Sequence, residues 1–152
     1  PLSVVITKKN IADVFNNGME YFNSFGGNPV SCEIGQAVLD VIKEEKLQEN
    51  ASSVGNYLLD GLKNIQNKYN IIGDVRGSGL FIGVELIEDM DNLVPAVDEA
   101  EIVVNAMKDK GILISSDGPD HNVLKIKPPL VFNKKNADYF LESFEAVLLK
   151  SF

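Results

Sequence analysis

The order of predicted elements across residues 47–152 constrains the fold more than any other feature of this 152-residue chain. Hydrophobic periods of 3.6 and 2 residues predict the order α-β-β-α-β-β-α, with turn residues between the segments. Strands come in consecutive pairs and helices separate the pairs. This order is typical of an α+β layer, in which helices pack on one face of a mostly antiparallel sheet. We therefore expect one small α+β domain over residues 47–152.

Within this domain, helices are predicted from residue 47 to about 69, from 95 to 110, and onward from an N-cap at Asn133. Strands are predicted over 71–75, 80–87, 112–114 and 122–126, and residues 76–79 are predicted as a turn. Gly111 is expected to end the middle helix in the left-handed conformation. In the second strand Phe81, Gly83 and Glu85 share one face, which leaves Ile82 and Val84 on the other.

The first 46 residues do not follow this pattern. An apolar strand is predicted at 2–6, a short helix ending at Phe15, and a long helix that begins after Gly26-Gly27-Asn28-Pro29. Asn28 is a suitable N-cap and Pro29 suits the first helical position. The apolar strand needs a partner. It is either the first strand of a protein that lost its initiator Met, or part of a chain cut from a larger one.

Composition and charge exclude several classes of protein. Lys and Arg total 14, Asp and Glu total 22, and the formal net charge of −8 gives little support for nucleic-acid binding. No apolar run is long enough for a membrane span. The single cysteine, Cys32, and the single histidine, His121, rule out an intrachain disulfide and argue against a metal site. A reducing, cytoplasmic location is predicted.

Three segments could bind an anion. Gly26 and Gly27 follow Ser24 and precede a helix N-terminus, an arrangement that suits a phosphate but is also common in ordinary loops. Arg76 is interpreted as a surface or ion-paired residue in a turn. Lys125 shares a strand face with Lys127, where both are either solvated or in contact with an anionic ligand. Two further residues are predicted to have no catalytic role: exposed His121 and buried Cys32.

Three ordered motifs resemble class III pyridoxal-phosphate (PLP) dependent aminotransferases. They are residues 19–32 (MEYFNSFGGNPVSC), residues 72–86 (IGDVRGSGLFIGVEL), and DGP at 117–119 with NVLKIKPP at 122–129. Together they cover essentially the whole chain. Within the family, the chain is most similar to the alanine-glyoxylate aminotransferase 2-like branch, which includes ethanolamine-phosphate phospho-lyase.

The resemblance implies the C-terminal part of a homodimeric, fold-type-I α/β enzyme. Residues 1–46 would be the end of its large PLP-binding domain, and residues 47–152 its small α+β domain. The lysine that forms the Schiff base with PLP would precede this chain, so the chain would contain no catalytic residue and would be inactive alone. Ser24 would bind the PLP phosphate of the partner subunit, where the family usually has Thr. Lys125 would bind the substrate, where many members have Arg.

Two questions about function stay open at this point. The parent enzyme would act on an amine or amino acid through a PLP aldimine, and either transfer the amino group or eliminate phosphate from a phosphorylated amine. Lysine cannot make the two parallel hydrogen bonds by which Arg binds a substrate carboxylate. Lys125 therefore favours a substrate that is a phosphorylated amine or an amine poor in carboxylates. The alternative function is a non-catalytic α+β interaction or small-molecule-sensing module. Such a module would bury or pair residues 2–6 within itself.

Overall fold

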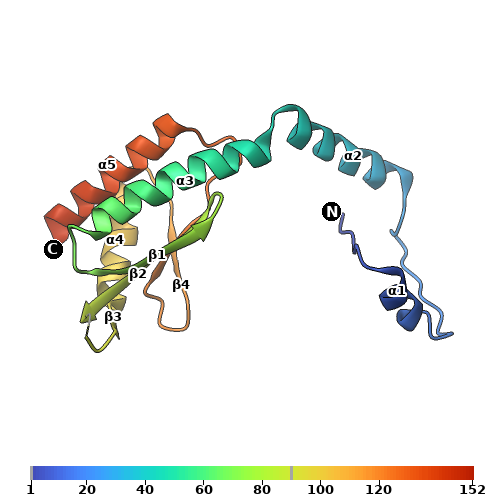
Figure 1. The fold of residues 1–152 in the computed structure, drawn as a ribbon, viewed down its shortest axis with the longest axis horizontal. Coiled ribbons are helices and arrows are strands. Elements are labelled where there is room, and N and C mark those ends of the chain that lie inside the picture. Colours follow the sequence, from blue (N-terminus) through green and yellow to red (C-terminus); the bar gives the residue numbers. More distant parts are fainter. Residues whose placement is uncertain (1, 90) are drawn as a thin grey trace. The chain divides into compact units, whose positions relative to one another are not determined.

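A computed structural model describes residues 2–89 and 91–152 of the chain (Figure 1). The chain divides into two compact units, Pro1–Glu45 and Lys46–Phe152. The second unit has the predicted mixture of helices and antiparallel strands.

The sheet of the second unit has four principal strands. They are β1 (Ile72–Ser78), β2 (Phe81–Asp89), β4 (Ser115–Asp117) and β5 (Val123–Ile126), in the spatial order β1-β2-β5-β4. All of these neighbours pair antiparallel, and a short strand β3 (Val94–Pro95) pairs with the end of β2. For β1–β2 and β4–β5 this follows from the sequence order, because a short turn can join only antiparallel neighbours.

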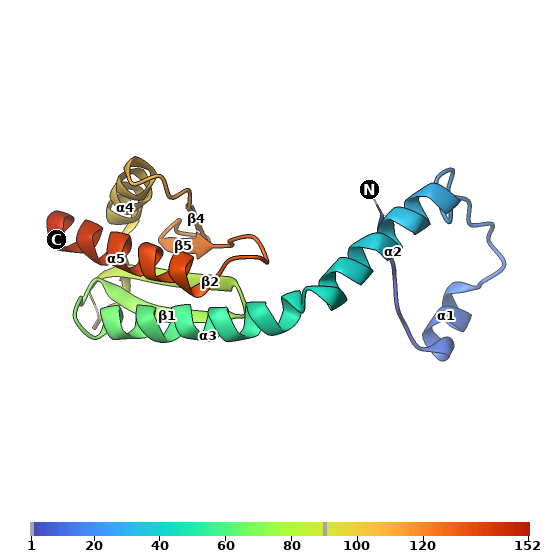
Figure 2. The same ribbon diagram turned by 90° about the horizontal axis from the view of Figure 1, so that it is seen from above.

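Three helices cover one face of this sheet: α3 (Leu47–Gln66), α4 (Val97–Asp109) and α5 (Lys134–Ser151). Helix α5 lies beside α3 in both ribbon views (Figure 2). Asn133 caps α5 as predicted, since its side chain accepts the Asn136 N–H and the Asn136 side chain accepts the Asn133 N–H. Fully buried Leu58, Leu62 and Phe144 pack with the apolar strand residues in a single core.

Alternation along the strands decides which residues enter that core. The side chains of Ile82, Val84, Leu124 and Ile126 are buried against the helices. The intervening residues, Phe81, Gly83, Glu85, Val123 and Lys125, are half-buried or exposed on the opposite face. Among the described residues of this unit no helix covers that opposite face, which we call the open face.

The structure corrects two strand predictions. Arg76 was predicted in a turn but lies inside β1, and the turn is confined to Gly79 and Leu80. The strand predicted at 112–114 occurs instead at Ser115–Asp117, and Leu113 is 84% exposed. Register explains the second error, because β4 pairs with β5 through Ser115 opposite Lys125 and Asp117 opposite Val123. The apolar triplet 112–114 therefore precedes the ladder.

The first unit contains helices α1 (Lys9–Phe15) and α2 (Pro29–Glu44), neither of which has a buried residue. Asn28 caps α2 as predicted and accepts the Ser31 N–H at 2.9 Å. The predicted strand at 2–6 was wrong, because this segment is assigned to no strand and Ile6 is 93% exposed. A strand requires a ladder partner, and the described part of this unit supplies none.

Within residues 2–89 and 91–152, no helix combines the length and the apolar character that a bilayer crossing requires.

Candidate functional site

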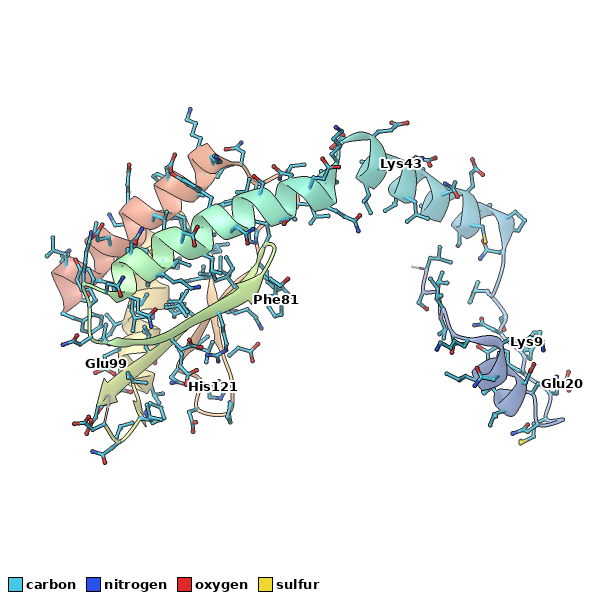
Figure 3. The ribbon with its side chains drawn as sticks, in the orientation of Figure 1. Lys9, Glu20, Lys43, Phe81, Glu99 and His121 are labelled. Atoms are coloured by element: carbon cyan, nitrogen blue, oxygen red, sulfur yellow. The ribbon has the colours of Figure 1, made fainter. Side chains whose placement is uncertain are left out.

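The open face of the sheet is hollowed between β1, β2, β4 and β5. The hollow has a volume of about 400 Å³. Phe81 begins β2 on this face, and His121 lies on the separate hairpin that joins β4 to β5 (Figure 3). The residues that line the hollow are Arg76, Gly77, Ser78, Phe81, Ile82, Gly83, Asp117, Gly118, Val123 and Lys125.

Sheet register places two cations in one row across this face. Arg76 of β1 is opposite Gly83 of β2, and Gly83 is in turn opposite Lys125 of β5. Neighbouring strands are about 4.8 Å apart, so the backbones of Arg76 and Lys125 are separated by roughly 10 Å. Gly83 lies between the two cations without a side chain, and Val123 packs close to it. A Cβ added there would meet Val123 Cγ1 at 3.2 Å.

Arg76 is held by two carboxylates. Its Nη1 donates to Asp74 Oδ2 at 2.7 Å and to Glu85 Oε2 at 2.6 Å. Hydrogen bonds to Asp74 and then Glu85 raise the pKa of Arg76 above its ordinary value. The ion-paired interpretation of this residue is confirmed, although its position in a strand was not foreseen.

Lys125 is held by a single carboxylate from the neighbouring strand. Its Nζ donates to Asp117 Oδ2 at 2.5 Å, and its side chain is 32% exposed. Asp117 is opposite Val123, two residues from Lys125, so the two side chains are diagonal neighbours on one face. The hydrogen bond from Lys125, followed by that from the Gly118 N–H, lowers the pKa of Asp117. The structure thus places Lys125 at the edge of a hollow and not in open solvent.

Lys127 was predicted to share a strand face with Lys125, but β5 ends at Ile126 and Lys127 lies just beyond the strand. Its Nζ lies 5.6 Å from the centre of the Phe81 ring, and Lys127 is exposed. It is absent from the residues that line the hollow. Of the two lysines, Lys125 is therefore the one in a position to contact a ligand there.

Ser24 lies in the first unit, in the turn that leads to α2. The Asn28 side chain stabilises this turn by donating to the Phe25 carbonyl at 2.7 Å while it caps the helix. Gly27 adopts a positive φ of 66°, a conformation that favours glycine. Ser24 is exposed, and its hydroxyl can donate to a phosphate oxygen beside the N-terminus of a 16-residue helix. This donor set fits the phosphate group of PLP.

Two residues that the sequence predicted to have no catalytic role, His121 and Cys32, are absent from the lining of the hollow. His121 is exposed, as expected, and has a positive φ of 55° in the β4–β5 hairpin. Cys32 is exposed in this unit, which contradicts the prediction of a buried position. In the described ranges, no group of three or more His, Cys, Asp or Glu side chains is arranged to hold a metal ion.

Sequence reasoning missed Asp117 and placed Arg76 wrongly. The signal for Arg76 was the alternation Asp74-Val75-Arg76, which continues the strand that starts at Ile72. No comparable signal identified Asp117, since its role depends on the pairing of β4 with β5.

Comparison with known proteins identifies the family. The class-III aminotransferase family model matches residues 1–148. A Drosophila melanogaster protein named alanine–glyoxylate aminotransferase 2-like is 48% identical over 97% of this chain and 30% of its own length. An Arabidopsis thaliana protein named alanine–glyoxylate aminotransferase 2 homolog 2, mitochondrial, is 47% identical over 99% of this chain and 31% of its own length.

The fold is also found among solved structures. A phospholyase from Arthrobacter in complex with phosphoethanolamine superposes with a TM-score of 0.87 and 40% identity, over 94% of this chain and 34% of that one. The chain thus spans about a third of the length of the proteins it matches. PLP is the cofactor of this family, and a PLP-bound amine transaminase is among the similar structures. The match over nearly the whole chain shows that this chain belongs to the class III aminotransferases.

Proposed function

We propose that this chain is the C-terminal part of a homodimeric PLP enzyme that acts on a phosphorylated amine. Residues 1–46 would complete the large PLP-binding domain, and residues 47–152 would form the small domain. The observation that carries the proposal is the position of Lys125 in the hollow of the open face. This places an ammonium group where the anionic end of a small substrate could bind.

The chemistry of Lys125 favours phosphate as that anionic end. An ammonium is a compact charge with three donors and imposes no planar geometry on its partner. It therefore binds a tetrahedral phosphate without the fork that Arg offers to a carboxylate. Support comes from the Arthrobacter phospholyase, which was crystallised with phosphoethanolamine. With that substrate and water, elimination yields inorganic phosphate, acetaldehyde and ammonia.

Amino transfer is the second candidate reaction, because the relative from Drosophila is named as an aminotransferase. When bound, PLP supplies the electron sink that either reaction needs. The role we assign to Ser24 is to hold the cofactor phosphate of the partner subunit through its hydroxyl. The role of Lys125 is to orient the substrate through its anionic end.

We further propose that the chain alone is inactive, because the lysine that binds PLP would lie upstream of residue 2. Lys8 and Lys9 do not match its position in the family motif. The exposed apolar residues Val4, Val5 and Ile6 support the assignment of this chain to a larger enzyme, since a segment of this kind is normally buried by a partner. The same exposure counts against a self-contained non-catalytic module.

A cytoplasmic location stays a prediction, because the relative from Arabidopsis is named mitochondrial.

The test of this proposal compares two reactions of the full-length enzyme that contains this chain. With PLP and phosphoethanolamine we expect release of inorganic phosphate, measured together with acetaldehyde. With alanine and glyoxylate we expect less turnover, measured as pyruvate. Faster pyruvate formation would favour the aminotransferase instead. As a control, the 152-residue chain is mixed with PLP and reduced with borohydride. A stoichiometric pyridoxyl adduct on one lysine would refute the upstream position of the PLP lysine.

The assignment of Ser24 has its own test in the full-length enzyme. Ser24→Ala removes one hydrogen bond to a charged phosphate and should weaken PLP binding about tenfold. Ser24→Thr keeps the hydroxyl and should bind PLP as the parent does. Both affinities can be measured from the PLP absorbance spectrum during dialysis and titration. Equal affinity of the alanine and threonine variants would remove Ser24 from the cofactor site.

A further inference from the structure

The partner of Lys125 is fixed from two sides. Asp117 Oδ2 accepts from Lys125 Nζ at 2.5 Å, and Oδ1 accepts from the backbone N–H of Gly118 at 2.9 Å. Gly118 has a positive φ of 87°, which forms the turn that directs its N–H to this carboxylate. The Asp117 carboxylate is therefore held by its own turn as well as by Lys125.

An anion that binds to Lys125 must share the ammonium with this carboxylate. Lys125 has three N–H donors, and one of them is given to Asp117. The other two can bond to a ligand, but the ligand's charge then lies within a few ångströms of another negative charge. The two repel each other, although the Asp117 side chain is 58% exposed and solvent screens part of this repulsion.

The remaining charges of the open face do not offset this repulsion. Arg76 faces the same hollow, but Asp74 and Glu85 both bind its Nη1. Together with Lys125 and Asp117, this gives two cations and three carboxylates in these ion pairs, and Lys127, which lies over Phe81, does not line the hollow. The hollow can attract an anion through specific bonds to Lys125, but it has no excess of positive charge.

We propose that Asp117 is a positioning residue that acts through Lys125 and lowers the affinity of this site for anions. It keeps the ammonium directed along the open face when no anion is bound, and it weakens retention of an anion that has bound. The identification of that anion as phosphate rests on the proposed function. In an enzyme that releases phosphate, this carboxylate would favour departure of the product.

Calorimetric titration of inorganic phosphate into the full-length, PLP-loaded enzyme tests the inference without an activity assay. Asp117→Asn retains the size of the side chain and an acceptor oxygen but removes its charge. We expect the dissociation constant for phosphate to fall about tenfold in this variant at low ionic strength. A charge effect is screened by salt, so the difference should shrink at about 1 M NaCl. A purely structural role of Asp117 would not give this salt dependence.

Two control variants separate the local effect from a change in total charge. Asp117→Glu keeps the charge and should bind phosphate nearly as the parent does. Asp120→Asn removes one charge from an exposed position in the same hairpin and should change the affinity by less than the experimental error. Unchanged or weaker binding by Asp117→Asn would overturn the inference.

Lys125→Ala distinguishes failure of this inference from failure of the proposed function. If this variant loses phosphate binding while Asp117→Asn gains none, Lys125 keeps its proposed role and only the role of Asp117 is refuted. If Lys125→Ala binds phosphate like the parent, then both the anion site and the inference are refuted. Tighter binding by Asp117→Asn in an enzyme that releases no phosphate from phosphoethanolamine would uphold the inference and refute the proposed reaction.

Discussion

Replacing Lys125 by alanine in the full-length enzyme is expected to lower kcat/KM for phosphoethanolamine about 100-fold, the equivalent of a charged hydrogen bond worth about 3 kcal/mol. The physical reason is that the half-buried ammonium of Lys125 is directed along the hollow of the open face. Without it, Asp117 stays as an unopposed negative charge and repels the substrate phosphate. The measurement is phosphate release under steady-state conditions, with folding checked by circular dichroism.

Lys127→Ala is the matched control for this variant. It removes the same charge two residues away, just after the end of β5, from a side chain that lies over Phe81 and does not line the hollow. We expect kcat/KM to stay within about twofold of the parent, because exposed charges contribute little to such interactions. Equal losses in the two lysine variants would show that only the general charge of the face matters.

Lys125→Arg examines the choice between phosphate and carboxylate. The planar guanidinium offers two parallel donors that fit a carboxylate. This variant should lose activity toward phosphoethanolamine and gain relative activity toward a carboxylate-bearing amine such as alanine. The ratio of the two kcat/KM values is the quantity to compare. An unchanged ratio would mean that Lys125 does not select the substrate.

The fold of the second unit could be predicted from the sequence because the hydrophobic periodicity and the residues that begin or end helices indicate the same elements. Asn133 and Gly111 stop or start helices through local backbone chemistry, and both are found where predicted. The alternation from Phe81 to Leu86 in β2 separates the core face from the open face, because successive side chains of a strand point to opposite sides. Local rules of this kind need no knowledge of distant segments.

The errors lie where distant segments decide the outcome. The strand at Ser115–Asp117 is fixed by its register with β5, and its own residues are polar. Residues 2–6 have the composition of a strand, but composition supplies no partner. The candidate site shows the same division. Lys125 stood out by its place in an apolar strand and received its role from the family resemblance, whereas the ion pair with Asp117 depends on diagonal neighbours across two strands.

Gly55→Ala is expected to lower the free energy of unfolding of the chain by about 3 kcal/mol, at the upper end of what overpacking usually costs. Gly55 is buried in α3, where the helix contacts the turn between β1 and β2. A Cβ at this position would overlap the Gly79 carbonyl oxygen and lie 2.8 Å from the Gly79 Cα. Both atoms belong to the backbone of the turn, and no rotation of a side chain can move them away.

Gly61→Ala in the same helix is the matched control. A Cβ there would overlap the side chain of Leu141, which can change its rotamer, and alanine is favoured over glycine in a helix by about 1 kcal/mol. We expect the unfolding free energy of this variant to stay within about 1 kcal/mol of the parent. Urea denaturation of both variants measures the difference, and equal stabilities would contradict the close contact of α3 with the turn. Because that turn joins the strands that carry Arg76 and Phe81, the packing of Gly55 against Gly79 also fixes one wall of the hollow.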